Sequence, residues 1–186
     1  MSYVDELLAA YRSFVALPWQ QNLAPAQRVW MAIYPPEYER RLRLHIPAFE
    51  VATKEADHSW ALVDISTKFE GWMAEHEYRE EYFKSPELLQ TALPAFFEQL
   101  VGEVSEEIGQ HSDRDGVVGV LGAGTLFGLG EAVKVSALLN AVNGAVAGRL
   151  LVFFPGQHEG NSYRLLDARD GWNYLAIPIT PKGNDR

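Results

Sequence analysis

The sequence predicts a single α/β domain in which helices flank a mainly parallel sheet. Short apolar runs of strand length alternate along the chain with longer segments whose apolar residues recur at helical spacing. The strand-like runs are apolar at successive positions, which is typical of strands buried on both faces. A chain of 186 residues is long enough for one domain with a substantial core. We therefore expect right-handed crossovers between parallel strands within one domain over residues 1–186.

The first elements are predicted by hydrophobic period and by proline. Residues 3–17 should form an amphipathic N-terminal helix that Pro18 ends, because proline cannot continue a helix. The run RVWMAIY at 28–34 is β-branched and aromatic, as in a buried strand. The next helix should begin at Pro36-Glu37, where the missing N–H of proline costs no hydrogen bond and the carboxylate favours the positive end of the helix dipole. Pro47 should kink or restart this helix.

The middle of the chain predicts one strand and a long helical region. Residues 60–66, WALVDIS, form the second expected strand, and residues 69–83 have a helical period with a strongly acidic outer face. Ser85-Pro86-Glu87 matches the cap and first turn of a helix, which should restart towards Leu93. A further helix should begin at Pro94 and end near the polar segment QHSDRDG.

The last third of the chain predicts three strands and a helix. Residues 117–121, VVGVL, form the third expected strand and lead through a glycine-punctuated stretch into a helix over 133–142. Residues 149–154 form the fourth strand. Residues 172–179 form the fifth, in which Pro178 indicates a place near the sheet edge or near the end of the strand. The tail, 181–186, is expected to be flexible.

Charge and composition exclude several classes of function. The chain has 16 Lys and Arg against 25 Asp and Glu, a formal charge of -9, so we expect no autonomous nucleic-acid binding. The lack of cysteine excludes disulfides, thiolate nucleophiles and cysteine-ligated zinc, and it fits an intracellular protein. No run approaches the roughly 20 apolar residues of a membrane span, and the N-terminus lacks the pattern of a secretion signal. We expect a cytoplasmic protein that does not bind membranes.

Two loops lie where α/β proteins bind phosphates, after a strand and before a helix. Gly122, Gly124 and Gly128 have the spacing GxGxxxG instead of GxGxxG, and the chain has no Gly-Lys-Ser or Gly-Lys-Thr. The loop after the first strand, YPPEYERR, has two prolines and a carboxylate where glycines and lysine would be needed. A tight turn explains the glycines, while a nucleotide-binding regulator that uses Gly122–Gly124 stays an alternative. The pattern is compatible with a degenerate P-loop NTPase-like core without Walker motifs.

The five histidines, at positions 45, 58, 76, 111 and 158, have none of the spacings of a metal site, so no metal or other cofactor is predicted. His158-Glu159 follows the fourth strand, where open α/β sheets place ligands. The pair would supply an acid and a base to a cryptic metal-dependent hydrolase or nuclease. Adjacent residues usually point apart, however, and no serine nucleophile elbow accompanies the pair.

The polar segment QHEGNSYR after the fourth strand is the candidate interaction site. Its side chains can hydrogen-bond a partner, and Tyr163 and Arg164 are of the types enriched among interface anchors. The alternative is structural: QHEGNS forms a turn, and Tyr163-Arg164 pack against the next segment. The candidate partner-binding residues are Gln157, His158, Glu159, Asn161, Tyr163 and Arg164.

The stretches VVGVLGAGTLFGLGEAVKVSALLNAV and RLLVFFPGQHEGNSYRLLDARDGWNYLAIPI resemble the BrxB family of the BREX bacteriophage-defence systems. That family has a strand ending in Gly-x-Gly, a helix rich in leucine and asparagine, a Phe-x-Pro-Gly-Glu-Tyr-Asp-Gly-like loop, a Leu-Arg-Leu segment and a closing aromatic strand. The earlier YPPEYERRLR resembles the family's Tyr-Pro-Pro element. Positions that match the C-terminal pattern are Phe153, Pro155, Gly156, Gly160, Arg164, Leu165 and Tyr174.

The sequence departs from the family pattern at three positions of this C-terminal part. Gln157 stands where the family commonly has glutamate, and Leu175 and Pro178 stand where the closing strand often has arginines. The resemblance implies a non-catalytic adaptor in a multi-gene defence system. Its implied partners are a large AAA-type ATPase, an alkaline-phosphatase-like PglZ protein and an adenine-specific DNA methyltransferase.

Overall fold

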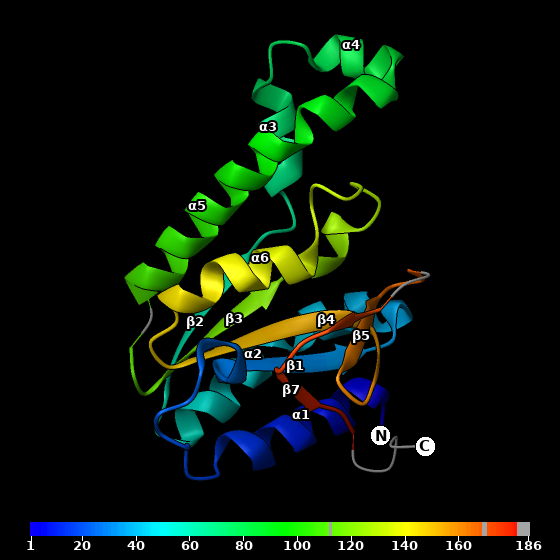
Figure 1. Ribbon diagram of the computed structural model, residues 1–186. Coiled ribbons are helices and arrows are strands. Elements are labelled where there is room, and N and C mark those ends of the chain that lie inside the picture. The colour runs from blue at the N-terminus through cyan, green and yellow to red at the C-terminus, as the bar shows by residue number, and fades with distance from the viewer. Residues whose placement is uncertain (112, 169–170, 182–186) are drawn as a thin grey trace.

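The computed structural model describes residues 1–111, 113–168 and 171–181, which form a twisted parallel sheet between helical layers (Figure 1). The strand order is β2-β3-β4-β1-β7, and every pair of neighbours in this order is parallel. This confirms the predicted single α/β domain with a mainly parallel five-strand sheet. The five strands are β1 (Val29–Tyr34), β2 (Ser59–Asp64), β3 (Gly116–Leu121), β4 (Arg149–Glu159) and β7 (Ile177–Ile179).

One face of the sheet is covered by α1 (Tyr3–Val15) and α2 (Glu39–Glu55) (Figure 1). Alternate residues of β1 point to this side, where Trp30 and Ala32 join a buried cluster with the two helices. Of the two predicted effects of Pro47, a kink or a restart, the restart does not occur, because α2 is one helix across the proline. Leu42, Ile46 and Phe49 are buried on both sides of the proline, and this burial holds the helix together.

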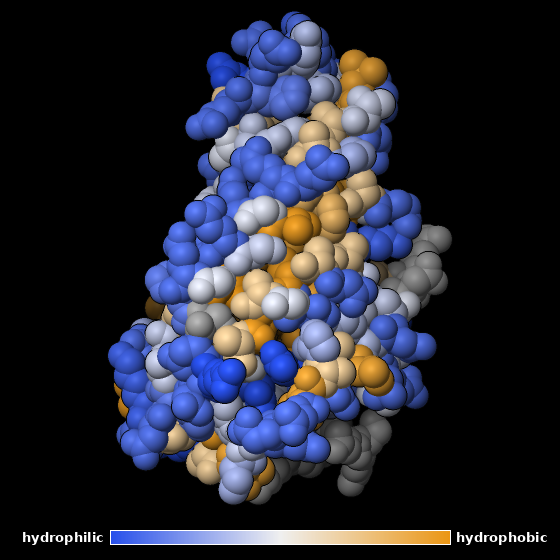
Figure 2. All heavy atoms as spheres, turned by 60° about the vertical axis from the view of Figure 1, so that its left-hand side comes forward, coloured by the Kyte–Doolittle hydropathy of each residue, from blue (hydrophilic) through white to orange (hydrophobic). Residues whose placement is uncertain are grey.

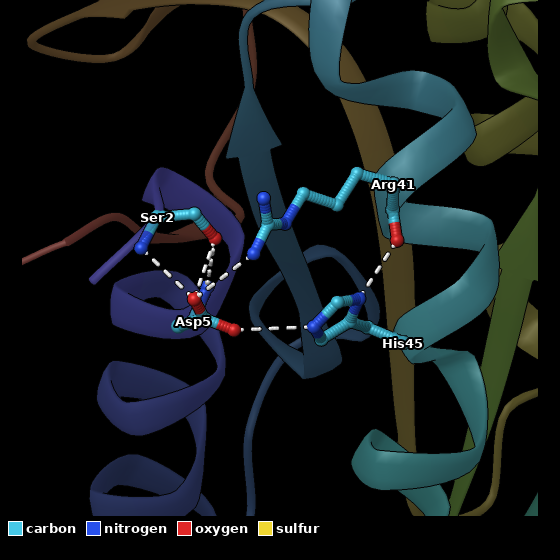
Figure 3. Close-up of polar contacts among 4 residues, drawn as sticks. All are labelled: Ser2, Asp5, Arg41 and His45. Atoms are coloured by element: carbon cyan, nitrogen blue, oxygen red, sulfur yellow. Dashed lines mark hydrogen bonds and ion pairs between the residues drawn. The ribbon is translucent and has the colours of Figure 1, made fainter.

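A polar cluster joins the start of α1 to α2 (Figure 3). Ser2 caps α1 in a capping box with Asp5, whose carboxylate accepts hydrogen bonds from both the backbone N–H and the hydroxyl of Ser2. On the other side, Arg41 lies 3.4 Å and His45 Nε2 lies 3.1 Å from the same carboxylate. One carboxylate thus caps one helix and docks it against the next.

The other face is covered by α5 (Leu93–His111) and α6 (Val135–Val142). The α5 side chains that enter this core recur every three or four residues, as a helix with one buried stripe requires. From β1, Val29, Met31 and Ile33 point to this side. Among the described residues, no helix combines the length and the apolar character needed to cross a membrane.

A helical arm extends from this layer beyond the sheet (Figure 1). It consists of α3 (Lys68–Glu75), α4 (Arg79–Lys84), the 3₁₀ helix η3 (Pro86–Thr91) and the adjoining part of α5. The predicted single helix over 69–83 is interrupted, because His76 is extended and its ring nitrogen accepts from the backbone N–H of Tyr78. The predicted restart at Pro86 is a 3₁₀ helix and not an α-helix.

The segment after the fourth predicted strand is a β-hairpin. Strand β4 continues to Glu159 and pairs antiparallel with β5 (Ser162–Leu165), which in turn pairs with β6 (Trp172–Asn173). The predicted fifth strand over 172–179 is therefore split between this hairpin and β7. Because β7 lies at the sheet edge beside β1, the edge position inferred from Pro178 is confirmed. Of the predicted tail, residues 182–186 lie outside the described residues.

Candidate functional site

The carboxyl ends of the parallel strands meet at one edge of the sheet, around a cavity of about 330 Å³. Strand β1 leads into α2 on one face, while β4 leads into the hairpin, whose Tyr163 and Leu165 join the core of the other face. Neighbouring strands that send the chain to opposite faces create the crevice in which open α/β sheets bind ligands. The cavity is lined by Pro36, Glu39, Arg43, Gly122, Gly124, Thr125, Pro155 and Leu166.

A tyrosine, a carboxylate and a guanidinium form the first part of a polar network at this edge. Tyr34, the last residue of β1, donates its hydroxyl to Glu39 in the first turn of α2. Arg43, one turn later, donates Nε to the other carboxylate oxygen of Glu39 at 2.8 Å. Burial of the Tyr34 phenol, together with the neighbouring Glu39 carboxylate, raises the pKa of Tyr34 far above its usual value. Tyr34 therefore stays a hydrogen-bond donor.

Arg43 also connects α2 to the end of β2. Its Nη2 donates to the hydroxyl of Ser66 at 2.6 Å, and its Nη1 lies 3.5 Å from Asp64. Asp64 in turn accepts from the backbone N–H of Ser66 at 2.9 Å and from its hydroxyl. One cation thus lies between two carboxylates, Glu39 and Asp64, and the polar groups at this edge satisfy one another.

The glycine-rich stretch after β3 packs closely against this network. Gly122 has φ +97°, and a Cβ there would lie 2.5 Å from Ser66 Oγ and 2.7 Å from the Ser66 backbone nitrogen. A Cβ on Gly124 would lie 3.2 Å from the ring of Pro155. The next residues form a 3₁₀ turn in which Thr125 bonds back to the carbonyl oxygen of Gly122. Close approach to the Ser66 backbone and the positive φ explain Gly122, as the tight-turn hypothesis expects, while Gly124 lies against the Pro155 ring.

The loop after β1 begins a helix, as its sequence predicts. Pro36 is the first residue of the 3₁₀ helix η2 (Pro36–Tyr38), which passes directly into α2. Pro35 and Pro36 have no N–H group, so the start of this helix has fewer donors for an anion than a glycine-rich loop has. Glu39, the first residue of α2, adds a negative charge near the start of this helix, which also disfavours an anion there.

The six predicted partner-binding residues come together in the β4–β5 hairpin. Gln157 and Arg164 are cross-strand neighbours on its exposed side, and an Arg164 Nη lies 3.4 Å from the Gln157 amide oxygen. Glu159 and Asn161 are exposed on either side of Gly160, which has φ +58°. His158 pairs with Tyr163, and their rings are stacked with centroids 5.9 Å apart.

The position of Tyr163 corrects its predicted role as an interface anchor. Its side chain is fully buried, its ring packs against Phe154 and Trp172, and its hydroxyl donates to the backbone oxygen of Ala176 at 2.9 Å. Burial raises the pKa of Tyr163 to about 12. A partner cannot reach the Tyr163 ring, because the ring is buried. The side chain instead attaches the hairpin to the body of the domain. The structural alternative therefore fits Tyr163, while Arg164 is exposed.

The structure also disagrees with the acid–base role of His158 and Glu159. They are consecutive residues of β4, so their side chains project to opposite faces of the hairpin. His158 is stacked on Tyr163, while Glu159 is exposed at the turn. Within the described ranges, no three His, Asp or Glu side chains lie close enough together to hold a metal ion. The two side chains do not converge on one reacting atom.

The comparisons with known proteins do not supply a family. No family model matches the chain, and neither a curated protein nor a solved structure matches it.

The sequence alone did not predict the polar network at the carboxyl edge. The spacing of Glu39 and Arg43, one helical turn apart, was a signal for an ion pair. Asp64 at the end of a strand was a second signal, which also fits an ordinary turn. That Arg43 reaches Asp64 and Ser66 depends on how α2 lies over the sheet, which the local sequence does not determine.

Proposed function

We propose that this protein is a non-catalytic adaptor of a BREX-type phage-defence complex, where it links a PglZ-like protein to a large AAA-type ATPase. The likeness of residues 117–142 and 149–179 to the BrxB family supports this role. The carboxyl-edge network carries the non-catalytic part of the proposal. Glu39 and Arg43 line the crevice in which an α/β enzyme would bind its substrate, and Arg43 is already hydrogen-bonded to Glu39 and Ser66.

The core is that of a degenerate P-loop NTPase in this proposal. Strand β1 and the helix after it occupy the place of the strand and helix that flank a phosphate-binding loop. In such a loop, backbone N–H groups and a lysine bind the phosphates. Here Pro35 and Pro36 remove donors, and the Glu39 carboxylate would repel a phosphate. Arg43, which lines the cavity at this edge, is already paired with Glu39 and Asp64.

The tip of the helical arm supports a role in binding proteins. Tyr78 and Phe83 are 54% and 70% exposed, and Leu88 is 49% exposed. These apolar side chains lie among the charged residues of α4 and η3, and Figure 2 shows apolar surface at the end of the arm and in a band below it. Large apolar side chains grouped on an exposed tip are typical of contact surfaces, in which aromatic residues act as anchors.

The hairpin provides a second surface. Its exposed polar residues, Gln157, Glu159, Asn161 and Arg164, keep their proposed role in partner binding. Tyr163 supports them from beneath, because it anchors the hairpin to the core. A protein that links two others needs two separate contact surfaces, and the arm tip and the hairpin meet this requirement.

Co-expression tests the proposal directly. The tagged protein is produced together with a PglZ-like protein and an AAA-type ATPase of a BREX system, and the complexes are measured by size-exclusion chromatography with light scattering. We expect stoichiometric complexes with both proteins. Binding to neither protein would overturn the adaptor role. Turnover of ATP or of a phosphodiester by the purified protein alone would overturn its non-catalytic part.

A further inference from the structure

The opposite edge of the sheet, where the strands begin, contains a larger cavity of about 480 Å³. It is lined by the loop of residues 20–23, by the segment 144–149 before and at the start of β4, and by Arg28 and Arg114. Arg28 precedes β1, Arg114 precedes β3, and Arg149 begins β4. Parallel strands place these three arginines at the same edge, although they are far apart in the sequence. Figure 2 brings this side forward and shows a group of strongly hydrophilic side chains below the apolar band.

Arg149 is built into the wall of this cavity. Its side chain is buried to 7% exposure and donates to the carbonyl oxygens of Gly148 at 3.1 Å and Gln20 at 2.7 Å. The guanidinium carbon lies 4.8 Å from the ring centre of Trp19 and 5.9 Å from that of Trp30. Its partners are thus carbonyl dipoles and aromatic faces, none of which carries a negative charge. The guanidinium is held rigidly, and its charge is only partly compensated.

Arg28 and Arg114 add two more cations to the same cavity. Arg28 is half-buried and donates to the carbonyl oxygen of Val146 at 3.0 Å, while Arg114 is exposed. Burial, followed by repulsion from Arg28, lowers the pKa of Arg149. Within the described ranges, none of the three arginines forms an ion pair with a carboxylate, although Asp and Glu outnumber Lys and Arg in the chain by 25 to 16.

Such an arrangement raises the free energy of the folded protein unless an anion completes it. Like charges near one another repel, and a desolvated cation without a counter-ion is unfavourable. The carboxyl edge of the sheet differs in this respect. Its partly buried cation, Arg43, forms ion pairs with two carboxylates, Glu39 and Asp64. The amino edge has three guanidinium groups around an open cavity and no carboxylate partner among the described residues.

We propose that this amino-edge cavity binds a small phosphate-bearing molecule with at least two negative charges, and that Arg28, Arg114 and Arg149 hold it. The planar guanidinium fork matches two oxygens of one phosphate group, and three such forks match more than one charge. Gln20, Gln21 and Asn22 also line the cavity, and amide side chains of this type can donate further hydrogen bonds. This inference does not depend on the proposed adaptor role.

The shape of the site and the charge of the chain favour a small ligand over nucleic acid. The cations surround one hollow and do not form an extended stripe along the surface. A formal charge of -9 would repel a phosphate backbone that extends beyond the hollow, because screening weakens but does not remove repulsion over several ångströms. A pyrophosphate group placed within the hollow would contact mainly the guanidinium groups.

Titration calorimetry with pyrophosphate, at low ionic strength and with the full chain, tests the site. We expect binding that is weakened about tenfold or more in Arg114→Gln and in Arg28→Gln, since each removes a charge-assisted contact. Arg114 is exposed, and no side-chain hydrogen bond or ion pair of Arg114 is found among the described residues. Arg114→Gln should therefore fold normally and report on binding alone. Arg40→Gln is the matched control, because Arg40 lies on the exposed side of α2 at the other edge.

Further arms of the experiment identify the source of the phosphate and the outcome that overturns the proposal. A nucleoside diphosphate that binds more tightly than pyrophosphate, with the same dependence on Arg114, identifies the ligand as a nucleotide. No heat with pyrophosphate or the nucleotide, or equal binding by Arg114→Gln and Arg40→Gln, overturns the site. Binding of a single-stranded oligonucleotide in the absence of any pyrophosphate binding also overturns it, in favour of a nucleic-acid surface.

Discussion

The guanidinium of Arg43 donates a 2.8 Å hydrogen bond to Glu39, one helical turn earlier in α2, at the carboxyl edge of the sheet. This ion pair, extended to Asp64 at 3.5 Å, joins α2 to the ends of β1 and β2. The contact links these three elements at the carboxyl edge. It therefore predicts measurable effects on stability.

Replacement of Arg43 by methionine should destabilise the domain by about 1–2 kcal/mol, after allowance for the solvent that reaches these partly exposed groups. The change leaves Glu39 and Asp64 without their cation and Ser66 without one of its donors. Urea unfolding followed by circular dichroism measures the loss. Arg12→Met is the control, because Arg12 forms one exposed ion pair with Glu55 at 3.8 Å and should change stability by less than about 0.5 kcal/mol. Equal losses in the two variants would contradict the network.

Gly122→Ala should destabilise the domain by about 2 kcal/mol or more, because φ +97° strains an alanine and its Cβ would meet Ser66 at 2.5 Å. Gly128→Ala is a matched control: it also has positive φ, at +83°, but nothing lies within 4 Å of the added Cβ. The difference between the two variants isolates the contact with Ser66. Thermal unfolding of both variants measures this difference. If Gly128→Ala lowered the stability as much as Gly122→Ala, the close approach of Gly122 to Ser66 would be disproved.

Tyr163→Phe should cost about 1–2 kcal/mol of stability, since it leaves the buried carbonyl oxygen of Ala176 without its donor. Arg164→Ala should leave stability within about 0.5 kcal/mol, because its side chain is exposed. Chemical unfolding of the two variants distinguishes a support residue from a surface residue. A destabilising Arg164→Ala together with a neutral Tyr163→Phe would reverse the roles assigned here.

The two proposed docking surfaces should be separable by mutation. Gln157→Ala with Arg164→Ala should abolish retention of one partner, and Tyr78→Ala with Phe83→Ala should abolish retention of the other, because each pair removes exposed anchor side chains. Pull-down of each partner by the folded variants measures this, with Arg40→Ala as the control. Full retention of both partners by both double variants would exclude these surfaces as the contacts.

Part of the stability should depend on pH through Asp5 (Figure 3). Hydrogen bonds from Ser2, with smaller contributions from His45 and Arg41, hold the pKa of Asp5 at about 2, below its ordinary value of 3.8. A lowered folded-state pKa stabilises the protein above the unfolded value, and the effect is lost as the pH falls from about 3.8 to about 2. Asp5→Asn should therefore lose less stability than the wild type over this interval.

Ser2→Ala provides the control for this effect, because it removes the largest cause of the low pKa while it keeps the carboxylate. Its stability should fall less steeply than that of the wild type over the same pH interval. Unfolding free energies at several pH values test this. Parallel curves for the wild type and both variants would rule out the contribution of Asp5.

Several elements could be predicted because their signals are local. The apolar runs placed all five strands of the parallel sheet, and Pro178 indicated an edge, where β7 lies. The hairpin was missed, since its strands are polar and short, and the pair Gly160-Asn161 was treated as part of a loop. The long acidic helix was predicted as continuous because the break at His76 depends on local hydrogen bonds that leave the helical period unchanged.

The sequence by itself determined the class of fold, the order along the chain of the five strands of the parallel sheet and the lack of a GxGxxG motif. The fold class and strand order could be predicted because hydrophobic period and proline act over a few residues. Only the tertiary structure decided which side chains meet. Arg43 reaches Asp64, and Arg28 lies beside Arg149, because strand order and helix packing bring together segments distant in the chain. Tyr163 is buried for the same reason: the hairpin folds onto Ala176. These contacts depend on the collective burial of the core, which no short segment encodes.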